Sequence, residues 1–151
     1  MTSKNSQKEP TSRLSLRLPL GLEHISTAAI LGRMFCESLG LNESTPELGS
    51  SVELATSEAC TNAVKYAGNG DLDAVFTVVY ELFPDKLVIS VEDPGIGFDT
   101  AAVPDPDLEQ HKEGGYGLFI IKSCMDVVTH SRPGKKNLLT MTKHLQPGEG
   151  K

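Results

Sequence analysis

Two runs of β-branched and other apolar residues, separated by a short turn, constrain the fold of this chain most strongly. Residues 74–82 read AVFTVVYEL and residues 86–93 read KLVISVED, and FPDK connects them. Enrichment in valine, isoleucine and aromatic residues is typical of strands, and so short a connection joins antiparallel neighbours. The two runs therefore predict an antiparallel β-hairpin.

The segments before this hairpin predict one further strand and two helices. Residues 13–20, RLSLRLPL, alternate leucine with polar residues, which predicts a half-buried strand. Residues 23–40 predict a helix that stops at a glycine, and a second helix starts near residue 46 or 47 and reaches about residue 67. In the first helix, the side chains that we expect to face inward are Ile25, Ala28 or Ala29, Phe35 and Leu39.

The segments after the hairpin predict a long loop, a helix and a second hairpin. Residues 94–117 are rich in glycine, proline and charge, so we expect either a functional lid or a disordered linker. A helix follows over residues 116–128, and residues 127–133 and 137–145 predict the second hairpin. This order predicts an α+β fold, a two-layer sandwich with one mixed, mostly antiparallel sheet and helices on one face.

The length and the ends of the chain indicate one domain. A chain of 151 residues has the size of a single domain with its own core. We expect residues 1–12 to form a disordered polar tail, residues 13–146 to form the folded domain, and residues 147–151 to be a flexible C-terminus.

Charge, hydropathy and cysteine usage restrict the partners and the compartment. The chain has 14 Lys and Arg against 20 Asp and Glu, and its longest basic run is Lys135-Lys136, which argues against direct contact with nucleic acid. No apolar run approaches the roughly 20 residues of a membrane span, and no secretory signal is present. Cys36, Cys60 and Cys124 lack metal spacing, so we expect reduced thiols. These features predict a cytoplasmic protein without membrane contact.

The second predicted helix carries an acid and an amide one turn apart. Glu58 and Asn62 are four residues apart, so their side chains lie on one face, beside a stripe of alanines. Such a pair is most often part of a solvated surface, but it also suits a polar ligand in a cleft. Mg²⁺ prefers oxygen ligands and shares them with substrate phosphates, which makes the Asn62 amide oxygen a candidate ligand.

Two glycine-containing motifs could meet the same ligand. Asp93 ends a predicted strand, and Gly95 and Gly97 follow it, which permits a close backbone approach. The Asp93 carboxylate could accept a hydrogen bond from an exocyclic amine such as that of adenine. In EGGYGLFII, glycines precede a helix whose N-terminal N–H groups would suit a phosphate. Taken singly, the first motif is more often a plain turn, and the second matches no standard phosphate loop.

Together these stretches resemble the GHKL ATPase superfamily, whose members have the Bergerat fold. SEACTNAV, DPGIGFD and GGYGLFII resemble its N, G1 and G2 boxes. With MTKHL they look most like the anti-sigma-factor serine/threonine kinases of the RsbW and SpoIIAB type. The resemblance covers about residues 13–145, and it implies ATP and Mg²⁺ as cofactors.

The resemblance also implies a role for each motif residue. Glu58 corresponds to the base that acts on the attacking hydroxyl, Asn62 to the residue that holds Mg²⁺, and Asp93 to the residue that reads adenine. Further cofactor-binding positions that it implies are Gly95 and Gly97 in the adenine pocket, and Gly115, Gly117 and Leu118 at the phosphate lid. Relatives often have a Gly-Thr where Lys136-Asn137 stand, so either Asn137 replaces the adenine-binding threonine or that contact is lost.

The activity that the resemblance implies is that of a Mg-ATP-dependent protein serine/threonine kinase that acts as an anti-sigma factor. Its partners would be a sigma factor or similar regulator and a STAS-type antagonist, which it phosphorylates in a partner-switching system. A homodimer is a further state that the resemblance allows. The alternative is a non-catalytic ATP-binding module that sequesters a regulator; Glu58 favours the kinase, because a sensor needs no base. A histidine kinase is disfavoured, because residues 1–45 are too short for a helix pair that carries an acceptor histidine.

Overall fold

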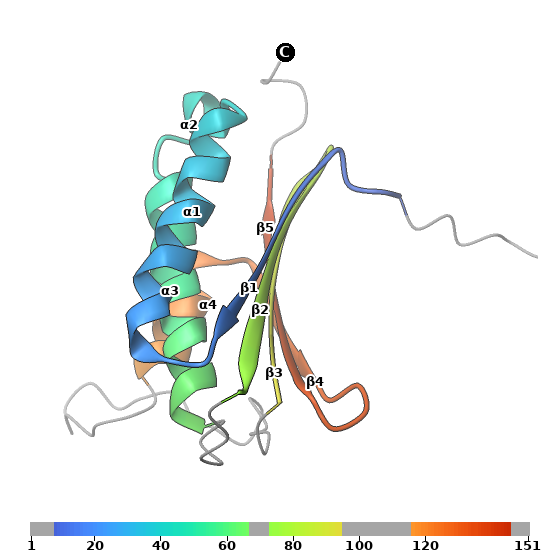
Figure 1. The fold of residues 1–151 in the computed structure, drawn as a ribbon. Coiled ribbons are helices and arrows are strands. Elements are labelled where there is room, and N and C mark those ends of the chain that lie inside the picture. The colour runs from blue at the N-terminus through green and yellow to red at the C-terminus, as the bar shows by residue number, and fades with distance from the viewer. Residues whose placement is uncertain (1–7, 67–72, 95–115, 146–151) are drawn as a thin grey trace, which may run out of the picture.

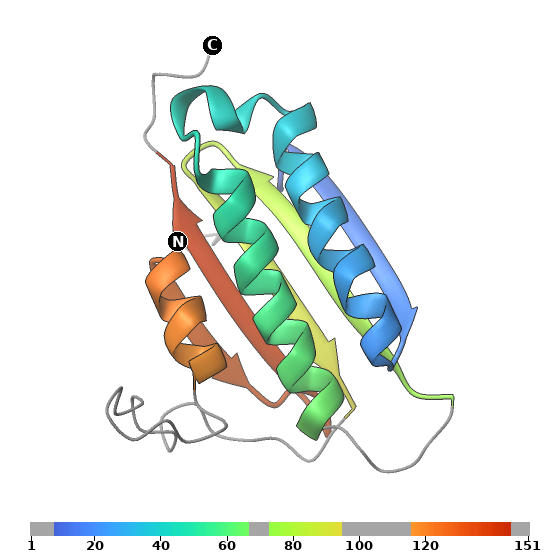
Figure 2. The same cartoon turned by 90° about the vertical axis from the view of Figure 1, so that its left-hand side faces the viewer.

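The structure is a computed structural model that describes residues 8–66, 73–94 and 116–145. Figures 1 and 2 show two layers, in which helices α1 (Ile25–Ser38), α3 (Leu48–Tyr66) and α4 (Tyr116–Cys124) cover one face of a twisted sheet. A 3₁₀ helix at Leu22–His24 leads into α1. The elements are β1 (Ser12–Pro19), α1 (Ile25–Ser38), α2 (Leu41–Ser44), α3 (Leu48–Tyr66), β2 (Val75–Phe83), β3 (Lys86–Asp93), α4 (Tyr116–Cys124), β4 (Val127–Ser131) and β5 (Asn137–His144). The predicted α+β class is confirmed.

The sheet has five strands in the order β1-β2-β3-β5-β4. All neighbouring pairs of these strands are antiparallel. The two hairpins expected from the sequence, β2–β3 and β4–β5, are present. Strand β5 lies between β3 and β4, and this order pairs the last residue of β3, Asp93, with the first residue of β5, Asn137.

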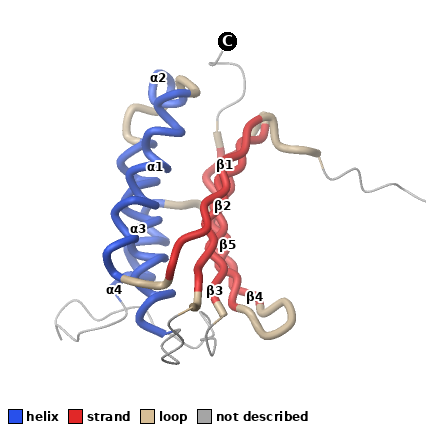
Figure 3. Tube along the Cα trace, in the orientation of Figure 1, coloured by secondary structure: helices blue, strands red, loops and turns tan. Residues whose placement is uncertain are grey.

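The core lies between the helices and the sheet, the two layers that Figure 3 separates by colour. Alternate residues of β2 and β3 are buried, which is the period expected when only one face of a sheet is covered. Among the helices, α3 contributes small residues to this core, and they allow it to approach the sheet closely. The core residues of α3 include Val52, Ala55, Ala59, Cys60 and Ala63.

Tyr80 of β2 connects the sheet to α1 and α3. Its buried hydroxyl donates to the carbonyl oxygen of Ala28 at 2.9 Å and is hydrogen-bonded to Thr56 Oγ1 at 3.1 Å. A methyl group built on Gly32 would lie 2.4 Å from the Tyr80 ring, so α1 needs a glycine there. These contacts fix the position of α3, the helix that carries Glu58 and Asn62.

The predicted end of the third long helix is wrong. We expected a helix over residues 116–128, but α4 ends at Cys124. Strand β4 begins at Val127, the residue at which the second hairpin was predicted to start. The Asp126 N–H donates to the Thr142 carbonyl oxygen at 2.9 Å, which attaches the chain to β5. Pairing with a neighbouring strand thus overrides the helical period of the local sequence.

The inward face of α1 also differs in part from the prediction. Ile25, Ala28 and Ala29 are buried as expected, but the last buried position of the helix is Cys36. Leu39 lies beyond the end of the helix and is half-buried.

Thiol burial raises the pKa of Cys36 to about 11 and that of Cys60 to about 12. No helix in the described parts of the chain is both long and apolar enough to cross a bilayer.

Candidate active site

Helix α3 presents Glu58 and Asn62 side by side. The two residues are one turn apart, and both are half-buried. The adjoining face of α3 carries the buried Ala55, Ala59 and Ala63, which pack into the core. Packing of this alanine stripe sets the rotation of the helix and so aims the acid and the amide away from the core.

The first turn of α4 lies directly against this pair. A methyl group built on Gly117 would be 2.8 Å from Glu58 Oε2 and 3.4 Å from Asn62 Oδ1. Any side chain at residue 117 would therefore displace the Glu58 carboxylate. The structure thus brings together three predicted site residues, Glu58, Asn62 and Gly117. The next residue, Leu118, is buried.

The chemistry of this group of residues suits a phosphorylated ligand. The first N–H groups of a helix have no partner within it, and its N-terminal end carries partial positive charge, so α4 offers a place for an anion. The Glu58 carboxylate oxygen Oε2 and the Asn62 amide oxygen Oδ1 lie beside this end of α4, and oxygen atoms of both kinds are ligands for Mg²⁺. Among the described residues no cluster of three or more His, Cys, Asp and Glu side chains could hold a metal. A cation held by Asn62 would share its remaining coordination positions with phosphate and water oxygens.

A second polar group is formed by Asp93 and Asn137. The two residues are direct partners in the register of β3 and β5, and Asn137 Nδ2 donates to Asp93 Oδ1 at 3.1 Å. Both residues are at least nine-tenths buried, with exposures of 8% and 5%. Asn137 Oδ1 is buried and has no hydrogen-bond partner in the described structure. A buried carboxylate with a fixed donor beside it is an acceptor of defined orientation.

The two groups lie at the same end of the molecule. In Figures 1 and 2, α3 and β3 end at the lower edge, where α4 and β5 begin. The predicted positions Gly95, Gly97 and Gly115, together with most of the expected lid, lie outside the described residues. The structure thus describes Glu58, Asn62, Asp93, Gly117, Leu118 and Asn137 from the predicted set.

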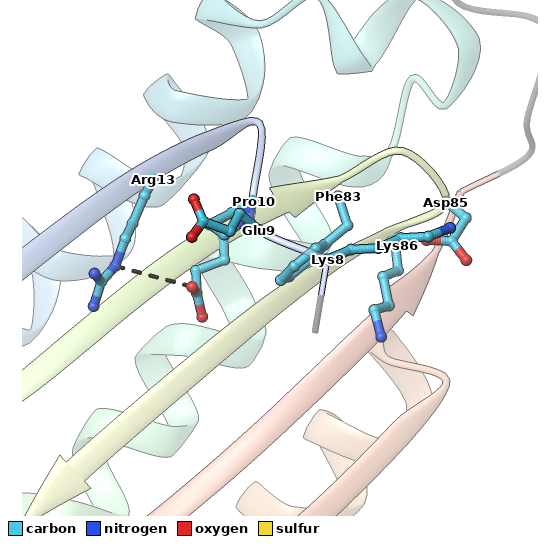
Figure 4. Close-up of a pocket in the computed structure, with 8 residues that line it drawn as sticks. Lys8, Glu9, Pro10, Arg13, Phe83, Asp85 and Lys86 are labelled. Carbon is cyan, nitrogen blue, oxygen red and sulfur yellow. Dashed lines mark ion pairs between the residues drawn. The ribbon is translucent and has the colours of Figure 1, made fainter. Parts of the chain in front are cut away.

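Two surface hollows are lined largely by charged residues, and an ion pair lies in each. One, of about 380 Å³, borders Asp93 and extends over the open face of the sheet, where Lys136 Nζ lies 3.3 Å from Glu92 Oε1. The other, of about 890 Å³, lies at the opposite end of the β2–β3 hairpin (Figure 4). There Arg13 Nε lies 3.9 Å from Glu81 Oε2. The second hollow is remote from the predicted site residues, and we assign it no role.

Sequence reasoning missed two features of this site. It assigned Gly117 to a phosphate lid. The absence of a side chain at Gly117 also leaves the space that the Glu58 and Asn62 side chains occupy. It gave Tyr116 no role, although the Tyr116 hydroxyl is buried at the start of α4 without a hydrogen-bond partner in the described structure. The only sequence signal for a role of Tyr116 was its position within GGYG, directly before the helix.

Comparison with known proteins gives consistent matches over nearly the whole chain. A family model described as a histidine kinase-like ATPase domain matches residues 18–143, which include every predicted site residue. Serine-protein kinase RsbW of Listeria innocua is 34% identical over 125 residues, which cover 77% of this chain and 77% of the relative. Serine-protein kinase RsbW of Staphylococcus aureus is 29% identical over 144 residues, with coverages of 88% and 87%.

The fold itself matches a solved structure. One chain in the crystal structure of the SiaB-SiaC complex from Pseudomonas aeruginosa superposes with a TM-score of 0.62. The match covers 87% of this chain and 88% of that chain, at 18% identity. At this identity the likeness establishes the two-layer fold.

Proposed function

Because this chain belongs to the histidine kinase-like ATPase domain family and is a serine-protein kinase of the RsbW type, we propose that it phosphorylates a STAS-type antagonist with Mg-ATP. In this proposal it also sequesters a sigma factor or similar regulator, and the phosphorylation state of the antagonist decides which partner it holds. Its cytoplasmic location and a homodimeric state are part of the same proposal.

The observation that carries the proposal is the position of Glu58 and Asn62 against the first turn of α4. The γ-phosphate of ATP would lie at the α4 N-terminus, and Asn62 would help to hold Mg²⁺, which neutralises phosphate charge when bound. Phosphoryl transfer depends mainly on positioning and charge neutralisation, and this arrangement supplies both.

Glu58 takes the role of the base in this proposal. The serine oxygen of the antagonist forms a bond to the γ-phosphorus, the bond to the β,γ-bridging oxygen breaks, and ADP leaves. The serine proton passes to Glu58, whose carboxylate lies beside both Asn62 and the α4 N-terminus. In this proposal the attacking hydroxyl approaches the phosphorus on the side of the Glu58 carboxylate.

The remaining predicted positions form the nucleotide pocket. Asp93 would accept a hydrogen bond from the amine of adenine, and its burial beside Asn137 supports this role. Gly95 and Gly97 would shape the adenine pocket. Gly115, Gly117 and Leu118 would cover the phosphates. The match of the family model to residues 18–143 supports these assignments, because all of these positions lie within it.

Exposed apolar residues support a protein as the phosphate acceptor. Several large apolar side chains are exposed on the helical layer, and one of them, Leu54, lies one turn before Glu58 on α3. An apolar surface beside a catalytic carboxylate suits a folded partner better than a small polar substrate. The exposed residues on these helices are Ile30, Met34, Leu54 and Phe119.

A phosphorylation assay tests this proposal. The protein is incubated with γ-labelled ATP, Mg²⁺ and each STAS-domain protein of the same genome, and phosphoserine is identified by mass spectrometry. We expect one antagonist to be labelled. The Asp93→Asn variant should bind ATP about 10–100-fold more weakly, because an amide cannot act as a full acceptor in a buried pair. Labelling of none of the antagonists, or equal ATP affinity of the variant in calorimetry, would contradict it.

A further inference from the structure

A groove of about 330 Å³ lies between α1 and α3, on the outer surface of the helical layer. Figure 2 looks onto this surface and shows the two helices side by side. Ile30 of α1 and Leu54 of α3 both line the groove, although 39% and 45% of their surfaces are exposed. Most of the other residues that line it are small: Ser26, Ala29, Ser50 and Ser57. Two large apolar side chains thus border one hollow whose other walls leave room for a third.

The groove suits an uncharged side chain. Of the described residues that line it, Glu53 alone is charged, and its Oε2 lies 2.6 Å from Arg33 Nη1. Because Arg33 neutralises this carboxylate, an aliphatic group can cover the groove without burying an unpaired charge. Burial of such a group against Ile30 and Leu54 removes apolar surface from water on both sides, which favours binding.

The helices around the groove carry an excess of negative charge. Residues 22–57 contain five glutamates, one arginine and no lysine. Glu47, for example, is exposed and lies one turn before Ser50 of the groove. Negative charge around a docking surface speeds the association of a positively charged partner, and salt screens this effect. The segment that complements this surface therefore has an aliphatic side chain with lysine or arginine near it.

One end of the groove lies beside the proposed base. Leu54 is one turn before Glu58 on α3, and Ser57 directly precedes Glu58 in the chain. One helical turn rises about 5.4 Å, which is about the length of two residues of an extended chain. A folded protein that presents a serine to Glu58 therefore also covers Leu54 and reaches the groove.

We propose that the groove between α1 and α3 binds an aliphatic side chain of the phosphate acceptor, on a segment that also carries lysine or arginine. This inference rests on the proposed function, because it takes the acceptor to be a protein that presents a serine to Glu58. The apolar contact with Ile30 and Leu54 supplies affinity. The surrounding glutamates speed the encounter and disfavour acidic segments.

The test measures equilibrium binding of the acceptor to the full chain with Mg²⁺ and a non-hydrolysable ATP analogue, and single-turnover transfer at saturating acceptor. The acceptor is the STAS-domain protein that the phosphorylation assay labels. We expect Ile30→Ser and Leu54→Ser each to raise the dissociation constant of the acceptor roughly 5–20-fold, with the saturated transfer rate and the ATP affinity unchanged. Ser50→Leu, which fills the groove from an exposed position, should have the same effect.

Two further variants sharpen the test. Val127→Ala is the matched control, because Val127 is 43% exposed but pairs with Thr142 on β5 and does not line the groove. It should bind the acceptor as tightly as the wild type. Glu47→Gln should slow association of the acceptor about twofold or more at low salt and leave its dissociation rate unchanged.

The outcomes separate this inference from the proposed function. If the wild type labels a STAS-domain protein, and Ile30→Ser, Leu54→Ser and Ser50→Leu bind that protein as tightly as the wild type does, the groove is not its docking site and the kinase proposal stands. A loss confined to the saturated transfer rate also refutes the inference, because a docking contact acts on affinity. If the wild type labels none of these proteins, both the inference and the proposed function are wrong.

Discussion

At the scale of single residues, the contact between Gly117 and Glu58 restricts side-chain size most tightly within the site. The backbone conformation of Gly117 is one that any residue can adopt, so its need for glycine comes from space alone. A methyl group there would meet Glu58 Oε2 at 2.8 Å, at the end of a flexible side chain that can move aside. The cost of a larger residue should therefore appear in catalysis and not in folding.

We predict that Gly117→Ala lowers the rate of phosphoryl transfer roughly 10–100-fold, because a displaced base loses its alignment with the hydroxyl. Its stability should be unchanged or slightly higher, since alanine favours helix more than glycine does by up to about 1 kcal/mol. Urea denaturation and single-turnover phosphorylation measure the two quantities.

Gly134→Ala is the matched control for this substitution. Gly134 has a φ of +66° with nothing near its Cβ position, so this variant should lose about 1 kcal/mol of stability and keep its activity. A Gly117→Ala enzyme with full activity would show that Glu58 does not need its observed position.

The three cysteines should differ in reactivity, because burial raises the pKa of the Cys36 thiol to about 11 and that of Cys60 to about 12. Only a thiolate reacts with a disulfide reagent, and these two thiols stay protonated as pH rises through 8 and 9. We predict that the native protein at about pH 8 reacts rapidly at the half-buried Cys124 only, and at all three thiols in urea. Rapid reaction of native Cys124→Ser would contradict the burial of the other two.

At the scale of elements, the contact of Tyr80 with α1 and α3 determines where the site helix lies. The hydroxyl reaches the carbonyl oxygen of Ala28 and Thr56 Oγ1, and burial raises its pKa well above the usual range. Because this group is neutral and bonded to both helices, it joins the sheet to α1 and α3 at one point.

We predict that Tyr80→Phe lowers the free energy of unfolding by about 1–3 kcal/mol, because Thr56 and the Ala28 carbonyl oxygen lose a buried partner. Tyr116→Phe is the matched control, since the Tyr116 hydroxyl is buried without a partner among the described residues. That change should be neutral or stabilising. Urea denaturation without nucleotide measures both, and equal losses in the two variants would contradict the role of Tyr80.

At the scale of the whole molecule, the strand order brings the site together. Asp93 ends β3 and Asn137 begins β5, and these residues are neighbours only because β5 inserts between β3 and β4. The same end of the sandwich receives the end of α3 and the start of α4 (Figure 1). The topology, and not proximity in the chain, thus places the elements that carry the two polar groups toward one end of the sandwich.

Local sequence patterns therefore predicted the helices and strands better than they predicted the contacts between them. The alternation in β1, the β-branched content and short turn of β2 and β3, and the four-residue spacing of Glu58 and Asn62 were sufficient to predict those strands and that face of α3. The start of β4 was predicted, but the end of α4 was placed too late, because the bond of Asp126 to Thr142 that draws the chain out of the helix is made to another strand. The Asp93–Asn137 bond likewise depends on which strand lies beside β3.

The most direct test of the account is a single-turnover measurement of phosphoryl transfer to the antagonist by the wild type, Glu58→Gln and Asn62→Ala, with nucleotide and partner binding measured separately. We predict that Glu58→Gln keeps nearly full binding of nucleotide and partner, and transfers phosphate roughly 10²–10⁴-fold more slowly. Asn62→Ala should weaken Mg²⁺-dependent nucleotide binding and abolish transfer. If Glu58→Gln transfers phosphate at the wild-type rate, Glu58 is not the base. If the wild type phosphorylates nothing but binds a regulator in an ATP-dependent way, the protein is a non-catalytic module instead.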